Sequence, residues 1–187
     1  MPHMRFPTVR DLFDAFPTAL DDIGVEASDE TSLAFLARML SEQALVRGLS
    51  FCAYLLPRRE AVWWGCQCLR QLNTISPQEA ACLGVAEAWV RDPEEARRKE
   101  AVELANKMST RLAATWAAFA AAWAGGTVDG AGGYSIPVPA HSTAQAIRAA
   151  LILGAHGLPE ASRMIIQARW LEGGMKLAAG SGETSIR

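Results

Sequence analysis

Apolar residues recur at the spacing of an α-helix along most of this sequence, and they do not alternate over any length that would form a useful strand. Residues 33–56 place leucine, alanine and cysteine at intervals of three and four, and the register changes between Ser41 and Gly48. Because a helix turns once in about 3.6 residues, this spacing gathers the apolar side chains on one face. The sequence therefore predicts an all-α fold.

Two proline-containing segments mark the starts of consecutive helices. Residues 76–79 (Ser-Pro-Gln-Glu) and 92–95 (Asp-Pro-Glu-Glu) each offer a capping side chain, a proline at the first helical position and a glutamate three residues after the cap. The glutamate can accept a hydrogen bond from the cap residue, which completes a capping box. These starts lie only 16 residues apart, so we expect the two helices to form a tight antiparallel hairpin.

Short connections of the same kind occur near residues 57, 74–76, 109 and 157. We therefore expect seven to nine helices in antiparallel hairpins, arranged as an irregular bundle or a short α-solenoid. No fixed sequence period is present, which argues against tetratricopeptide or ankyrin repeats.

A chain of 187 residues can bury one core without disulfides or metal ions. We expect residues 1–30 to form a short N-terminal helix and a polar linker, and residues 31–178 to form a single helical domain. This domain contains a Gly/Pro-rich loop at residues 125–140, which is long for a compact protein. Residues 179–187 are expected to form a flexible tail.

The helix expected over residues 111–124 combines a stripe of large apolar residues with many alanines. The stripe consists of Leu112, Trp116, Phe119 and Trp123. Small residues on the other sides allow neighbouring helices to approach closely, so we expect a central, enclosed helix whose aromatic rings belong to the core.

The four cysteines, Cys52, Cys66, Cys68 and Cys82, all fall in apolar runs. Two residues of separation place Cys66 and Cys68 about 200° apart around a helix, so one zinc ion or one disulfide cannot join them. We expect buried free thiols and a reducing compartment.

Charge and hydropathy exclude several classes of protein. The chain carries 18 basic and 20 acidic residues, for a formal net charge of −2, so we expect no nucleic-acid partner. The longest uncharged stretch, residues 112–128, is mostly alanine and contains two glycines, so we expect no membrane insertion. No apolar segment typical of a secretory signal follows the first residues, which favours a cytoplasmic location.

Motifs for catalysis are scarce. The histidines His3, His141 and His156 have no zinc-binding spacing and no recognisable nucleophile partner. We therefore expect no enzymatic activity, no metal and no cofactor. A small-molecule-binding or enzymatic helical domain with a pocket near His141 remains an alternative.

Residues 58–70 give the clearest indication of a binding surface. Turning at about 100° per residue places Trp64 in the apolar arc and Trp63 outside it, on the polar flank. Tryptophan and arginine are enriched at binding hot spots. We predict a partner-binding surface made of Arg59, Trp63, Gln67 and Arg70, with Tyr134 and Ile136 from the Gly/Pro-rich loop. The alternative is that a neighbouring helix or this loop covers Trp63.

Four short segments carry a family resemblance. They are residues 56–64 (Leu-Pro-Arg-Arg-Glu-Ala-Val-Trp-Trp), residues 88–90 (Ala-Trp-Val), and residues 123–126 followed by 137–144. The chain resembles an uncharacterised family of small all-helical bacterial proteins associated with type VI secretion gene clusters. The similarity covers about residues 30–175, and the run Arg58–Trp64 is its most specific part.

The resemblance implies no catalytic residue, because none is established for the family. It implies an accessory role, as an adaptor or chaperone that handles a secreted effector or a spike-tip component before export. The sequence as a whole thus favours a non-catalytic protein-interaction module with a protein partner, and leaves a homo-oligomer open. An immunity protein that binds a toxin is a further alternative, although a near-neutral charge does not favour it.

Overall fold

Ten α-helices and one short β-hairpin make up residues 4–129 and 135–180, which are the residues that the computed structural model describes. The helices are α1 (Val9–Ala15), α2 (Ala19–Ile23), α3 (Ser32–Ser41), α4 (Leu45–Leu55), α5 (Arg58–Arg70), α6 (Pro77–Arg91), α7 (Glu95–Lys107), α8 (Ala113–Ala122), α9 (Ser142–His156) and α10 (Glu160–Ala178). The predicted all-α fold is confirmed. The described residues contain ten helices, one more than the upper limit of the seven to nine that we expected.

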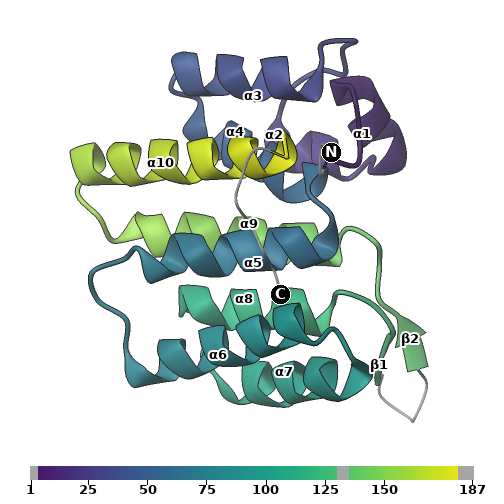
Figure 1. The fold of residues 1–187 in the computed structure, drawn as a ribbon, viewed down its shortest axis with the longest axis vertical. Helices are drawn as coiled ribbons and strands as arrows, with labels where there is room; N and C mark the ends of the chain where they lie inside the picture. Colours follow the sequence, from purple (N-terminus) through teal and green to yellow (C-terminus); the bar gives the residue numbers. More distant parts are fainter. Residues whose placement is uncertain (1–3, 130–134, 181–187) are drawn as a thin grey trace.

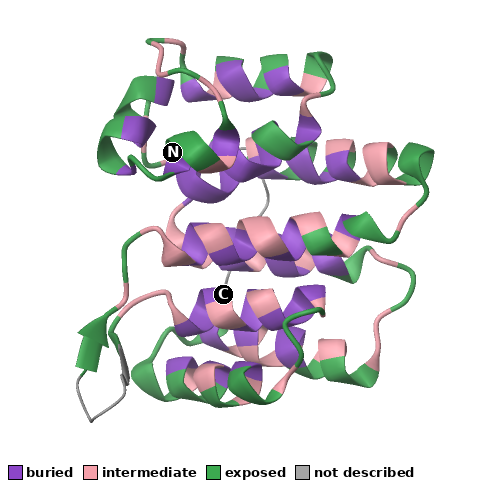
Figure 2. Cartoon of the chain, turned by 180° about the vertical axis from the view of Figure 1, so that it is seen from behind, coloured by how far each residue is buried: buried purple, intermediate pink, exposed green. Residues whose placement is uncertain are grey.

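The helices stack in layers along the long axis of the molecule (Figure 1). α1, α2 and α3 lie at one end, followed by α4 and α10, then by α5 and α9, and finally by α6, α7 and α8. Buried residues gather on the helix faces that meet between these layers (Figure 2). The arrangement is an irregular helical bundle.

One of the two predicted capping boxes is present. The Ser76 hydroxyl accepts a hydrogen bond from Glu79 N at 3.2 Å, and the Glu79 carboxylate accepts one from Ser76 N at 3.0 Å. The second prediction is wrong, because α7 begins at Glu95 and no side chain caps it. Asp92 instead closes α6, with its N–H donating to Ala88 O at 3.0 Å.

The additional helix, α2, lies where the sequence suggested the start of a polar linker. It is held by its own Asp22, whose carboxylate accepts hydrogen bonds from the Tyr54 hydroxyl and from Gln145 Nε2. Arg148 completes the contact, with 3.6 Å between NH1 and Asp22 Oδ1. Burial, with Asp22 beside it, raises the pKa of the Tyr54 hydroxyl. This polar network fastens α2 to α4 and α9.

The Gly/Pro-rich loop contains a two-stranded antiparallel hairpin, which the sequence did not predict. β1 (Thr127–Asp129) pairs with β2 (Ser135–Pro137), and Val128 lies opposite Ile136. Strands of three residues are too short for an alternating pattern to be recognised. Arg58 holds both ends of the loop, donating to Ala124 O at 2.9 Å and to Ala140 O at 3.5 Å.

α8 is the central helix that the sequence predicted, but it buries its alanines and not its aromatic rings. Its alanines at 113, 114, 117, 118, 120, 121 and 122 are buried. Trp116, Phe119 and Trp123 are partly exposed and only border the core. α8 packs against α5, α6, α7 and α9, and four close neighbours leave room for methyl groups but not for rings.

The four cysteines are buried and free, as predicted. Burial raises the pKa of the Cys52 and Cys66 thiols well above the ordinary value, so few thiolates form at neutral pH. Within the described residues, no helix is long and apolar enough to cross a membrane. Residues 181–187 of the expected tail lie outside the described part of the chain.

A close contact on α10 gives a test of this packing. A Cβ at Gly174 would lie 2.5 Å from Cys52 Sγ and 3.0 Å from the Trp64 ring. We expect Gly174→Ala to lower the free energy of unfolding by about 1–3 kcal/mol, because the added methyl overpacks the core. Urea denaturation followed by circular dichroism measures this change.

Gly173 supplies the matched control, since it is exposed on the same helix and a Cβ there meets nothing within 4 Å. Gly173→Ala is expected to raise stability by up to about 1 kcal/mol through helix propensity. Equal urea midpoints for the two variants would contradict the tight packing of α10 on α4 and α5.

Candidate functional site

The predicted surface on α5 is turned toward another helix of the same chain. Arg59 Nε donates to Val90 O at 2.6 Å, and its NH2 donates to Arg91 O at 3.5 Å. Arg70 binds Glu87 through two hydrogen bonds of 2.9 Å each. Both arginines therefore reach the C-terminal part of α6 and hold α5 to it.

The two neighbouring tryptophans separate as the sequence predicted. Trp64 is 2% exposed, and its Nε1 donates to Trp170 O at 3.0 Å. Trp63 is partly buried and packs against the edge of the core. Gln67 is also partly buried, and its backbone carbonyl accepts a hydrogen bond from Gln71 Nε2. The face with Trp63 thus lies between two arginines that are already engaged.

The loop residues of the predicted surface lie elsewhere. Tyr134 falls outside the described residues, whereas Ile136 on β2 is 52% exposed. Ile136 lines a small apolar hollow of about 230 Å³ together with Trp123 and the Pro137–Pro139 segment. Arg58 fixes the start of α5 beside this hairpin, but Arg70 lies roughly 18 Å farther along the helix axis. The structure therefore does not gather the predicted residues into one site.

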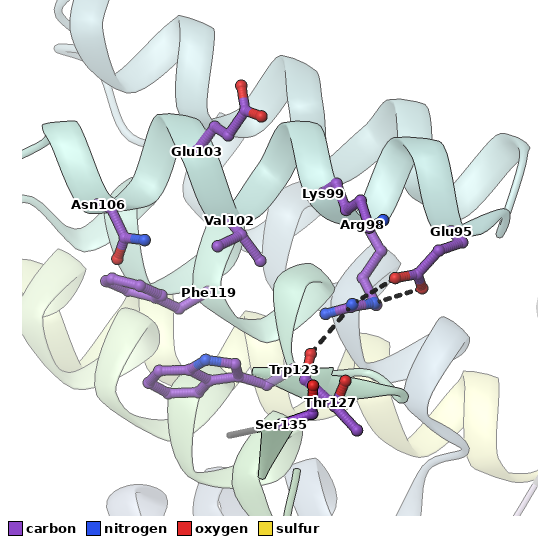
Figure 3. A pocket seen from close by; sticks show the side chains of 10 residues that line it. All are labelled: Glu95, Arg98, Lys99, Val102, Glu103, Asn106, Phe119, Trp123, Thr127 and Ser135. Atoms are coloured by element: carbon purple, nitrogen blue, oxygen red, sulfur yellow. Dashed lines mark hydrogen bonds and ion pairs between the residues drawn. The ribbon is translucent and has the colours of Figure 1, made fainter. Parts of the chain in front are cut away.

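A larger groove, of about 690 Å³, lies between α7, the end of α8 and the hairpin (Figure 3). α7 contributes polar and charged side chains along one wall, α8 contributes aromatic rings, and the strands close one end. The lining residues are Glu95, Arg98, Lys99, Val102, Glu103, Asn106, Phe119, Trp123, Thr127 and Ser135.

Stacked aromatic rings form the apolar side of this groove. Phe119 and Trp123 are parallel within 23°, with ring centroids 4.8 Å apart. Trp116 lies next to them on α8, with its ring 5.9 Å from that of Phe119 and tilted by 55°, and its indole N–H donates to Thr110 O. All three rings are partly exposed. Rings held in this way present apolar area at little cost in side-chain entropy, because they are already ordered.

Arg98 fixes the shape of the groove from beneath α7. Its side chain is only 8% exposed and binds the Glu95 carboxylate through Nε at 2.7 Å and NH2 at 2.6 Å. It also donates to Ala122 O at 2.9 Å and to Thr127 O at 3.2 Å. One guanidinium therefore joins α7 to the end of α8 and to β1, as Figure 3 shows for Glu95 and Thr127.

Glycine is required where Arg98 meets the backbone. Gly126 has φ +71°, and a Cβ there would lie 3.1 Å from the guanidinium carbon of Arg98. The hydrogen bonds from Arg98 lower the pKa of the Glu95 carboxyl. A lowered folded-state pKa means that this pair stabilises the fold at neutral pH and is lost as the pH falls through that pKa.

The groove contains no histidine or cysteine among its described lining residues. In the described part of the chain, no group of three or more histidine, cysteine, aspartate or glutamate residues is placed to hold a metal ion. His141 is partly exposed at the start of α9 and does not line the groove. The described lining combines the aromatic rings of Phe119 and Trp123 with polar side chains of α7.

Sequence reasoning missed this groove although part of the signal was present. Trp116, Phe119 and Trp123 share one stripe of α8, but a stripe alone does not say which side of the helix faces the core. Arg98 gave no signal, since its partners Ala122 and Thr127 lie 24 and 29 residues away.

Comparison with known proteins identifies the domain. The model of the family of unknown function DUF6931 matches residues 35–178. The chain belongs to this family. No curated protein and no solved structure matches it. The DUF6931 match includes α7, α8 and the hairpin, so the whole groove lies inside the family domain, whereas α1 and α2 precede it.

The role of Arg98 in the DUF6931 domain can be tested by stability. We expect Arg98→Met to lower the free energy of unfolding by about 1–3 kcal/mol, because it leaves the buried carbonyl of Ala122 without a hydrogen bond. Urea denaturation at neutral pH measures the loss.

The adjacent Arg97 is a matched control. Its side chain is 43% exposed and forms surface ion pairs with Asp92 and Glu100. Arg97→Met is expected to change stability by less than about 0.5 kcal/mol. A loss for Arg98→Met no larger than this would contradict the structural role of the buried guanidinium.

Proposed function

We propose that this DUF6931 protein is a non-catalytic protein-interaction module, and that the groove between α7, α8 and the hairpin binds an extended segment of a partner protein. One observation carries the proposal. α8 buries its alanines and leaves its three largest side chains partly exposed beside a groove. Clustered, partly exposed aromatic rings are typical of surfaces that another molecule covers.

The composition of the groove supports a polypeptide ligand. Phe119 and Trp123 offer an apolar side, while Lys99, Glu103 and Asn106 on α7 offer both hydrogen-bond donors and acceptors. An extended segment carries side chains for the former and backbone N–H and C=O groups for the latter. The exposed Ile136 beside Trp123 lengthens the apolar area beyond the groove.

The resemblance to proteins of type VI secretion gene clusters suggests the partner. We propose that the module is an adaptor or chaperone that holds a secreted effector or a spike-tip component in the cytoplasm before export. This step rests on the sequence of residues 56–64 and on the related segments described above. It is separable from the groove, since the groove can bind a segment of any suitable partner.

A peptide selected on the wild-type protein from a displayed random library tests the groove. We expect Phe119→Ala and Trp123→Ala each to weaken its binding by roughly tenfold or more, because each removes a hot-spot aromatic contact. Fluorescence anisotropy measures affinity, and circular dichroism confirms that each variant keeps its helical content.

Trp63→Ala is the matched control, because it removes an indole from the competing surface on α5. We expect it to change the affinity by less than about twofold. The opposite pattern, in which Trp63→Ala abolishes binding and the groove variants do not, would assign binding to α5 and refute the groove.

The secretion role needs a separate experiment in cells. We expect a tagged wild-type protein, but not its Trp123→Ala variant, to co-purify with an effector or spike-tip protein encoded in the same gene cluster. Recovery of the same secretion component by both forms would show that this partner does not bind through the groove. Recovery of no secretion component by the wild type would count against the adaptor role.

A further inference from the structure

A further hollow, of about 520 Å³, lies where the start of α4 meets the first turns of α10. It shares no lining residue with the groove of α7 and α8. α10 begins at the edge of the molecule that faces away from the hairpin (Figure 1). The hollow is therefore a different place on the molecule from the groove discussed above.

The start of α4 presents backbone donors without acceptors. Ala44 is the N-cap residue, so no side chain caps the helix, and the first turn holds no acidic residue. Gly48 N donates to Ala44 O at 3.1 Å, which leaves the N–H groups of Leu45, Val46 and Arg47 without an acceptor in the described part of the chain. These three N–H groups lie at the positive end of an 11-residue helix.

Gln167 provides an independent indication of a ligand. This residue of α10 lines the hollow and is only 6% exposed. Its side-chain amide makes no hydrogen bond with any described residue. Unlike Trp170 Nε1, this amide is not fully closed off from solvent, and Gln167 is one of the residues that line the hollow. A buried amide beside an open hollow without a partner is expected to be satisfied by something that enters.

The remaining lining residues define the charge of the ligand. Arg47 is the basic residue at the rim and Glu160 is the acidic one. Because these two balance, a doubly charged phosphate would lack a compensating charge, whereas a single carboxylate can be held by the neutral donors of α4 and Gln167. Val46, which is 42% exposed, and Met164 provide an apolar surface next to these donors.

We propose that this hollow binds a ligand that presents one carboxylate next to an apolar group. The first-turn N–H groups of α4 and the Gln167 amide donate to the carboxylate, Arg47 adds charge at the rim, and Val46 and Met164 contact the apolar group. A free carboxylic acid and the C-terminal carboxylate of a peptide share this chemistry.

Two probes that differ only in charge test the proposal. N-acetyl-L-leucine carries the carboxylate, and N-acetyl-L-leucinamide replaces it with an amide. In ¹⁵N-resolved NMR titrations of the full chain, we expect the acid to shift the Leu45, Val46 and Arg47 amide signals saturably. The amide is expected to bind roughly tenfold more weakly or worse, through loss of charge-assisted hydrogen bonds.

Acetylated tetrapeptides ending in leucine, with free or amidated C-termini, distinguish the two sources. Tighter binding of the free tetrapeptide than of N-acetyl-L-leucine identifies a peptide C-terminus as the ligand. Equal affinity identifies a small acid. Equal binding of acid and amide forms, or no saturable shift with any acid, would overturn the proposal.

Variants separate a binding role from a structural one. Gln167→Leu removes a buried amide that has no partner, so we expect at least tenfold weaker binding of N-acetyl-L-leucine while the urea midpoint stays equal or rises. Arg47→Gln, on an exposed side chain, is expected to weaken binding severalfold without affecting the fold. Arg169→Gln, an exposed change on α10 outside the hollow, is the control and should leave binding unchanged. Unchanged affinity in both Gln167→Leu and Arg47→Gln would refute the site.

Discussion

The close packing of α8 is the constraint on which the arrangement of α5, α6, α7 and α9 depends. α5, α6, α7 and α9 all contact this helix, and seven alanines fill the interfaces. Helix axes can approach to about 8 Å when the side chains between them are this small. The same closeness leaves no volume for Trp116, Phe119 and Trp123, which are displaced to the one side of α8 that its neighbours do not cover. The aromatic groove is thus a consequence of how the core is packed.

Arginine side chains fix the positions of the elements that pack around α8. Alanine side chains do not interlock in one specific way. α6, α7 and the hairpin therefore need further contacts to fix their positions. Arg58, Arg59 and Arg98 all donate to backbone carbonyls at helix ends or in the loop, at distances between 2.6 and 3.5 Å. The carbonyls at a helix C-terminus have no intrahelical partner, and a planar guanidinium can satisfy two of them at once. Arg59 and Arg98 therefore act as C-terminal caps of α6 and α8 that are supplied from a distant part of the chain, and Arg58 binds carbonyls of the loop.

This use of arginine explains which parts of the structure the sequence could predict. Helix positions follow from local information, as with the Ser76–Glu79 capping box and the buried Trp64, so α3 to α10 lie close to where the pattern placed them. The partners of Arg59 and Arg70 lie 31 and 17 residues away, and periodicity cannot reveal them. From sequence alone, Arg59 and Arg70 beside Trp63 therefore indicate a surface open to a partner, although both guanidiniums bind α6. The orientation of α8 cannot be predicted for a similar reason, since a helix with small residues on three sides and rings on the fourth can bury either set.

The groove and the hollow at the start of α4 differ in which groups of the polypeptide are left available to a ligand. In the groove, the buried guanidinium of Arg98 has its partners, and the apolar ring area of Phe119 and Trp123 gains free energy when another surface covers it. At the start of α4 the apolar area is modest, and what remains are donors: three backbone N–H groups and the Gln167 amide. Apolar area accepts many side chains with limited discrimination, whereas fixed donors discriminate strongly by charge and geometry. On the two proposals made above, the groove suits varied polypeptide segments and the hollow suits one chemical group.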